Sequence, residues 1–171
     1  MKNNKGVTLV SLVITIVVLL IISGITVNVS NDVIKQANLQ DLKTNMLLIQ
    51  AKAKTYAEEV KFQTANLDET KEADKTKIAE IKATNLKGTA LELCDTSIQN
   101  AADNAKVTDT ADFYYLSREN LSEMGINIEV PEGAYYLVKY NFEDTEVVYT
   151  KGFKYQNQVY YKLSEINQIE Q

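Results

Sequence analysis

The chain has 171 residues and a formal net charge of −5, with 18 Lys and Arg against 23 Asp and Glu. It has no His and a single cysteine, Cys94, which excludes His-based catalytic triads, His-ligated zinc sites, an internal disulfide and a CxxC redox pair. The acidic balance argues against a nucleic-acid-binding surface, which is usually basic, so no nucleic-acid partner is expected. A chain of this length commonly forms one domain.

The charges are unevenly distributed, because no charged residue lies between Lys5 and Asp32. As a helix, this uncharged stretch would be about 39 Å long, whereas the hydrocarbon core of a bilayer is about 30 Å thick. In lipid a single apolar segment satisfies its backbone only as a helix. The sequence therefore predicts a transmembrane helix over residues 7–30. Lys2 and Lys5 predict a single-pass protein of the cell membrane with a cytoplasmic N-terminus and an extracellular C-terminal domain.

Three kinds of N-terminal segment could carry such an apolar stretch. A cleaved secretory signal fits poorly, because its apolar part is about 7–15 residues long and Ile22-Ser23-Gly24 matches the small-residue cleavage site only weakly. An uncleaved signal anchor fits the hydropathy well. A third interpretation depends on the residues at the boundary between the basic leader and the apolar segment.

The residues Lys5-Gly6-Val7-Thr8-Leu9 place a basic leader and a glycine directly before the apolar segment. This pattern resembles the class III signal of type IV pilins and pseudopilins, which reads K-G-[apolar]-T-L-[apolar]-E. The resemblance implies that a prepilin peptidase cleaves after Gly6 and that Val7 becomes the N-methylated first residue. A glycine suits this position because it has no Cβ to obstruct a narrow protease cleft. The resemblance also implies that the helix contacts membrane lipids and, after assembly, other pilin-like subunits.

One position departs from the family pattern. The family usually has a glutamate five residues into the mature chain, where this sequence has Ser11. That carboxylate is expected to neutralise the N-terminal amine of a neighbouring subunit, because an unpaired charge in a low-dielectric bundle is costly. A serine hydroxyl can accept a hydrogen bond but carries no charge. Together with the preference for Lys over Arg and the single cysteine, Ser11 favours a Gram-positive, minor-pilin-like member of the family.

The helical pattern continues beyond the apolar stretch. Apolar residues recur at spacings of three and four, and no Pro interrupts the chain, so residues 31–62 are predicted to form an amphipathic second half of the same helix. We expect its apolar seam to pack on the chain's own globular region, with a coiled coil to a partner as the alternative. The seam comprises Leu39, Leu42, Met46, Ile49, Ala53, Tyr56 and Val60.

Residues 63–171 are predicted to form an exported globular region. Ser117 is expected to be the N-cap of a short helix. Three strands are predicted over Ala134–Asn141, Thr145–Thr150 and Gln158–Leu163, and together they form an antiparallel meander over residues 134–163. Nine of the ten tyrosines follow Phe113 and are expected to fill a half-buried sheet face, with a carbohydrate-binding or adhesive patch as the alternative.

The predicted fold class is α+β. Residues 1–6 form a leader peptide, and a long N-terminal helix follows, whose first half is the transmembrane and filament-core segment. Its second half packs on a small C-terminal antiparallel sheet of about three strands. We expect a structural subunit of a type IV pilus-like or a type II secretion or competence pseudopilus filament on the cell surface, with no enzymatic activity and no cofactor or metal. The alternative is a non-polymerising, signal-anchored surface protein with a binding ectodomain.

Overall fold

The computed structural model describes the backbone of residues 5–169 and the side chains of residues 12–19 and 33–169. The chain divides into two compact units, Met1–Gln40 and Asp41–Gln171, which are described separately below. One helix, α1 (Lys5–Thr64), contributes residues to both units. Apart from α1, all the elements belong to the second unit.

In the second unit, α1 is amphipathic as the spacing predicts. Met46, Ile49 and Ala53 are fully buried and Val60 is 7% exposed. These positions lie on one side of a helix with 3.6 residues per turn, so their side chains form a continuous seam along it. The seam packs within its own unit, and the expectation of a domain-packed amphipathic helix is confirmed there.

The second unit contains a five-stranded antiparallel sheet whose strand order follows the sequence. The strands are β1 (Thr89–Ala90), β2 (Phe113–Leu116), β3 (Tyr136–Lys139), β4 (Glu146–Tyr155) and β5 (Gln158–Lys162). The predicted number of about three strands is therefore wrong. The strands β1 and β2 were missed because two residues are too few to show alternation, and Phe-Tyr-Tyr-Leu is apolar or aromatic at every position.

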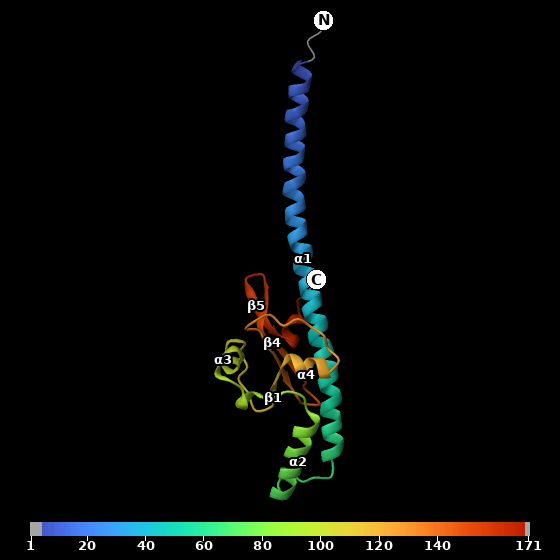
Figure 1. Ribbon diagram of the computed structural model, residues 1–171, viewed down its shortest axis with the longest axis vertical. Coiled ribbons are helices and arrows are strands. Elements are labelled where there is room, and N and C mark those ends of the chain that lie inside the picture. Colours follow the sequence, from blue (N-terminus) through green and yellow to red (C-terminus); the bar gives the residue numbers. More distant parts are fainter. Residues whose placement is uncertain (1–4, 170–171) are drawn as a thin grey trace. The chain divides into compact units, whose positions relative to one another are not determined.

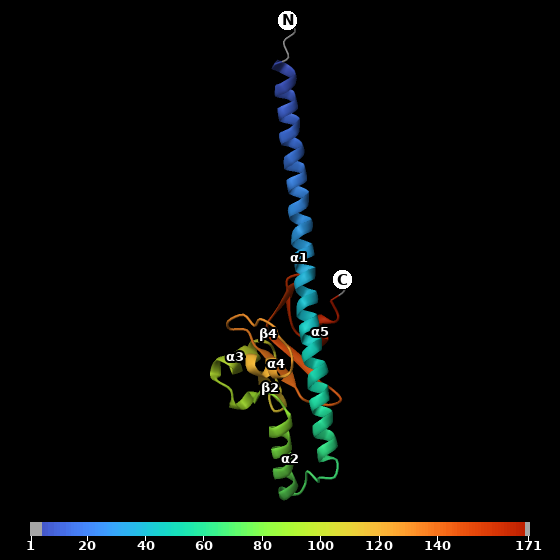
Figure 2. The same cartoon turned by 45° about the vertical axis from the view of Figure 1, so that its right-hand side comes forward.

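The two faces of the sheet are covered by different helices (Figures 1 and 2). Val138 pairs with Val147, and both lie on the face of Tyr136, whose hydroxyl hydrogen-bonds to Asn45 of α1. Leu137 pairs with Val148, and these point to the opposite face because successive strand residues alternate. That second face forms a core with α3 (Thr96–Asn104) and the residues around it, including Ile98, Ala102 and Phe113.

Short helices precede, connect and follow the strands. They are α2 (Glu72–Asn85), the 3-10 turn η1 (Leu91–Leu93), α4 (Arg118–Glu123) and α5 (Leu163–Ile166). Ser117 is the N-cap of α4, as predicted: its hydroxyl accepts a hydrogen bond from the Asn120 backbone, and the Asn120 side chain accepts one from the Ser117 backbone. This reciprocal pair satisfies two amide groups that the first turn leaves unbonded.

The expected transmembrane helix over residues 7–30 is contradicted. Within the described residues, none of the helices combines the length and the apolar character that crossing a bilayer requires. The single-pass assignment to the cell membrane, with a cytoplasmic N-terminus and an extracellular C-terminal domain, is corrected with it. The side chains of residues 5–11 and 20–32 lie outside the described set.

Gly88 provides a test of the β1–β2 pairing. Its φ is +106°, and a Cβ on this residue would lie 2.5 Å from the backbone oxygen of Tyr115. We expect Gly88→Ala to lower the free energy of unfolding by about 2 kcal/mol or more, because strain at positive φ adds to a backbone clash. Gly133→Ala is the matched control, since Gly133 has φ +71° but open space around it. Urea denaturation that gives equal losses for the two variants would refute the close approach.

Candidate assembly surface

The residues of the predicted processing site lie at the beginning of α1. Gly6, Val7 and Ser11 have helical backbone, and Lys5 is the first residue of the helix. Their side chains lie outside the described set, so the cleavage site, the methylated residue and the missing glutamate stay predictions.

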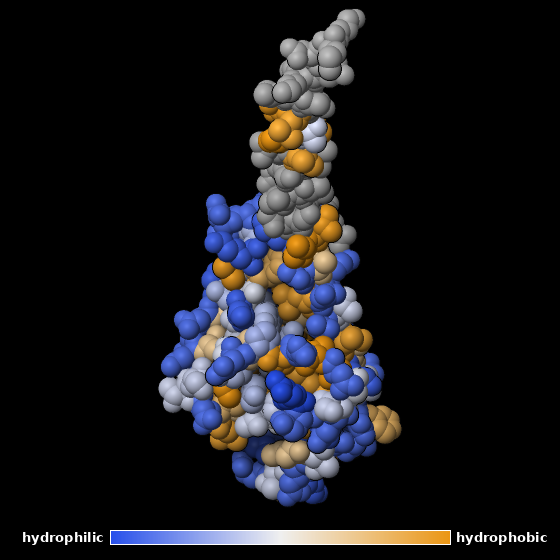
Figure 3. Space-filling view, turned by 45° about the horizontal axis from the view of Figure 1, so that its top comes forward, coloured by the Kyte–Doolittle hydropathy of each residue, from blue (hydrophilic) through white to orange (hydrophobic). Residues whose placement is uncertain are grey.

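The described part of the first unit exposes apolar side chains on every side of α1. Residues 12–19 read Leu-Val-Ile-Thr-Ile-Val-Val-Leu, and each is exposed. The large apolar members are between 45% and 61% exposed, and this covers more than two turns of helix. Figure 3 shows apolar side chains of this segment uncovered. We call residues 12–19 the apolar collar.

A soluble monomer rarely exposes a continuous apolar surface of this kind, because water disfavours it. A two-stranded coiled coil needs only a narrow apolar seam on each helix. The collar has no polar side except Thr15, so one partner helix would leave most of it in water. Its composition fits a site that several neighbouring helices cover together.

In the second unit, α1 also has a face directed away from the sheet. Leu47 and Leu48 are 42% and 50% exposed, and Phe62 is 84% exposed. At 100° per residue, these three lie on the side of the helix opposite the buried Ile49 and Ala53. We call this side the outer α1 face. The exposed Lys54 and Glu58 lie on the same side between them, so the outer α1 face combines separate apolar residues with charged ones.

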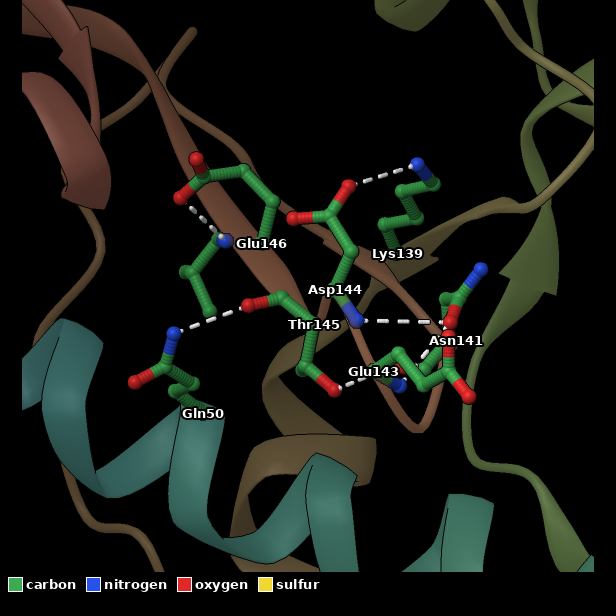
Figure 4. Close-up of polar contacts among 8 residues, drawn as sticks. Gln50, Lys139, Asn141, Glu143, Asp144, Thr145 and Glu146 are labelled. Carbon is green, nitrogen blue, oxygen red and sulfur yellow. Dashed lines mark hydrogen bonds and ion pairs between the residues drawn. The ribbon is translucent and has the colours of Figure 1, made fainter.

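The β3–β4 loop is attached to α1 by polar contacts (Figure 4). The Gln50 amide donates to the Thr145 carbonyl oxygen at 2.8 Å, and Lys139 pairs with Asp144 at 3.1 Å. Asn141 Oδ1 accepts hydrogen bonds from the backbone amides of residues 143 and 144 at 3.0 and 3.3 Å. These side chains close the turn and hold it on the helix, so their chemistry is used for structure.

The tyrosines of the sheet pack against each other and against α1. Tyr114 and Tyr140 form an edge-to-face pair with ring centroids 5.2 Å apart, and Tyr115 and Tyr135 another at 5.6 Å. The Tyr140 hydroxyl donates to the Lys87 carbonyl oxygen at 2.9 Å. Burial raises the pKa of Tyr140 and of Tyr136 well above the ordinary tyrosine value. These rings therefore act as half-buried core residues.

The described residues of the second unit include Asp, Glu and Cys side chains, which are groups that could bind a metal ion. Among the described residues, no cluster of three or more His, Cys, Asp and Glu is placed to hold a metal ion. A cavity of about 310 Å³ beside α1 mixes Lys61 and Lys82 with Asp112 and Glu143. Cys94 is half-buried, its thiol donates to the Ala90 carbonyl oxygen at 3.4 Å, and burial raises its pKa, which disfavours the reactive thiolate.

Comparisons with known proteins found no matching family model, no matching curated protein and no matching solved structure. The resemblance of residues 5–9 to the pilin signal therefore stays a prediction made from those residues.

The buried tyrosines predict a loss of stability at alkaline pH. The unfolded chain loses the phenol protons near pH 10, whereas the folded chain keeps those of Tyr136 and Tyr140 to higher pH. The stabilisation is complete below pH 10 and is lost as pH rises through the folded pKa. Between pH 9 and pH 11 we expect a loss on the order of 1 kcal/mol per tyrosine, measured by urea denaturation.

The double variant Tyr136→Phe, Tyr140→Phe should flatten this dependence. If the double variant loses as much stability between pH 9 and pH 11 as the wild type does, these two phenols are not the cause.

Proposed function

We propose that the chain is a pilin-like structural subunit, and that many copies assemble through the N-terminal part of α1 into a type IV pilus-like or pseudopilus filament. The apolar collar carries this proposal. Its side chains are exposed on all sides of the helix, and a filament core surrounds each helix with several others. The Lys5-Gly6-Val7-Thr8-Leu9 pattern independently supports the same class of protein.

The energy available from the collar is large enough to drive assembly. Full burial of a Val, Leu or Ile side chain stabilises a complex by about 1.5–3 kcal/mol. Association costs roughly 4–15 kcal/mol in lost freedom of motion, so the seven apolar side chains of the collar can exceed that cost only if most are covered. A single partner helix would cover one side, whereas a bundle of copies covers all of them. The collar therefore favours a multi-copy core over a dimer.

Processing belongs to the same proposal. A prepilin peptidase would cleave between Gly6 and Val7, and the new amine of Val7 would be methylated. The cut removes Lys2 and Lys5, the only charged side chains before Asp32 in the sequence. This matters for assembly, because charged side chains beside an apolar core must either be paired or stay in water. The remaining charge is the amine itself, and Ser11 can offer it a hydrogen bond but no counter-charge.

A charged substitution in the collar tests the assembly surface. We expect Val17→Lys to abolish sedimentable filaments, because burying an unpaired ammonium group costs several kcal/mol per copy. Ala79→Lys is the matched control, because it introduces the same charge at an exposed position of α2, and it should leave assembly unchanged. Both variants should unfold at the wild-type urea concentration. Filaments of Val17→Lys as abundant as those of the wild type would contradict the proposal.

Intact-mass measurement tests the processing. With the peptidase present, the mature protein should lack residues 1–6 and carry one additional methyl group. Gly6→Leu should block this change, because a bulky side chain no longer fits the position that glycine occupies. A mature mass that does not depend on residue 6 would mean that the chain is not handled as a prepilin.

A further inference from the structure

The β4–β5 hairpin extends beyond the rest of the sheet. Strand β3 pairs with β4 only as far as Tyr149, whereas β4 continues to pair with β5 up to Tyr155 opposite Gln158. Residues 151–160 therefore extend beyond β3 as a two-stranded ribbon (Figure 1), whereas Lys162 lies opposite Val148 within the sheet. We call residues 151–160 the lysine ribbon, because they contain two lysines and no acidic residue.

The ribbon is basic on an acidic protein. Residues 92–146 contain twelve Asp and Glu but only three Lys and Arg, so the segment that precedes the ribbon has a net charge of −9, more negative than the −7 of the whole second unit. Lys151 and Lys154 are exposed. None of the ion pairs among the described residues includes either of them, while five other lysines are paired. The two ammonium groups are thus available to an acidic partner.

The chain itself carries a matching acidic surface at α3. Glu92 of η1 and Asp103 of α3 are exposed and line a cavity of about 270 Å³, together with Leu91, Gln99 and Thr110, and the exposed Asp95 precedes α3. The Gln99 amide is occupied, because it donates to the Cys94 carbonyl oxygen at 2.9 Å and to that of Glu92 at 3.2 Å. The carboxylates form no ion pair within the part of the chain that the structure describes.

One exposed apolar side chain accompanies the charges on the α3 face. Leu93 follows Glu92 in η1 and is 80% exposed, which is unusual for leucine. On the ribbon, Phe153 and Tyr155 are half-buried and lie on the strand face opposite to Lys154, because successive strand residues alternate. The contact therefore depends on charge, which supplies orientation and specificity more than affinity.

We propose that the lysine ribbon of one copy docks on the α3 face of a second copy, where Lys151 and Lys154 meet Glu92 and Asp103. The two surfaces are different, so the contact is head-to-tail, and a contact of this type continues from copy to copy unless its rotation closes a ring. Ribbon-to-ribbon pairing is disfavoured, because it would bring like charges together and because lysines on an exposed strand edge oppose strand pairing.

This inference rests on the proposed function, because it assigns the contact between the globular units of copies whose helices share one core. It also makes assembly depend on salt. Exposed ion pairs weaken as the Debye length falls from about 10 Å at 0.1 M to about 3 Å at 1 M ionic strength. The collar contact is apolar and does not weaken in this way.

Charge reversal in the processed full-length chain tests the contact. We expect Lys151→Glu with Lys154→Glu to raise the concentration needed for sedimentable assembly at least tenfold, and Glu92→Lys with Asp103→Lys to do the same. The variant with all four reversals should assemble close to wild type, because complementarity is restored. Lys71→Glu with Lys75→Glu, on the exposed surface of α2, is the matched control and should have no effect. Circular dichroism and urea denaturation confirm that each variant is folded.

The outcomes separate this inference from the proposed function. If the wild type forms no assemblies, both fail. If the wild type assembles and neither reversal pair has an effect, only the lysine-ribbon contact fails. A defect of the ribbon variant that the α3 reversals do not rescue would also overturn it, because the lysines would then serve another anionic partner.

Disulfide cross-linking tests whether the ribbon of one copy meets the α3 face of another. In a Cys94→Ala background, Lys154→Cys and Asp103→Cys in one chain should give an oxidised ladder of dimers, trimers and longer species, and a mixture of the two single variants should stop at dimers. A cross-link confined to one chain, or dimers from Lys154→Cys alone, would contradict a head-to-tail contact.

Discussion

The second unit depends on the packing of the buried α1 seam on the sheet. Met46, Ile49 and Ala53 are fully buried on the helix, and Val138 and Val147 are fully buried on the strands. The Gln50–Thr145 hydrogen bond fixes the same helix to the β3–β4 loop. Removing one large side chain from such a contact costs roughly 2–5 kcal/mol, which is a large part of the stability of a domain of this size.

This packing also determines which surfaces remain for partners. Because the seam faces the sheet, the outer α1 face with Leu47, Leu48 and Phe62 is left exposed. The opposite face of the sheet is covered by α3, so the acidic residues of η1 and α3 become the external surface there. A helical surface with exposed apolar residues and a pair of oppositely charged surfaces thus follow from one arrangement. They favour assembly by different forces, one insensitive to salt and one weakened by it.

The parts of the fold that the sequence predicts are those with a regular signal. The seam of α1 follows from its spacing, and the Ser117 cap follows from its chemistry. The third to fifth strands follow from alternation, although β4 extends to Tyr155 because the ribbon continues after β3 ends. Other elements have no such signal. Residues 100–112 have the composition of a loop, yet residues 100–104 belong to α3, which Ile98 and Ala102 anchor in the core, and only the packing reveals their role.

The sequence indicated some parts of the candidate site and not others. The collar is visible in the sequence as apolar residues, but hydropathy alone was interpreted as a membrane span, a prediction that the described helices contradict. The lysine ribbon and the α3 face were not predicted, because a charge pattern becomes a surface only when the exposed edge of β4–β5 is known. The position of Ser11 in an assembly stays a prediction, since its side chain lies outside the described set.

The central claim is that several neighbouring helices cover the apolar collar on all sides. The most direct test is thiol accessibility along it, with single cysteines at positions 12–14 and 16–19 in a Cys94→Ala background, each treated with a charged thiol reagent before and after assembly. The account predicts that every position reacts in the unassembled chain and that every position is protected in the assembled one. Protection of one helical face alone, or of none, would contradict it.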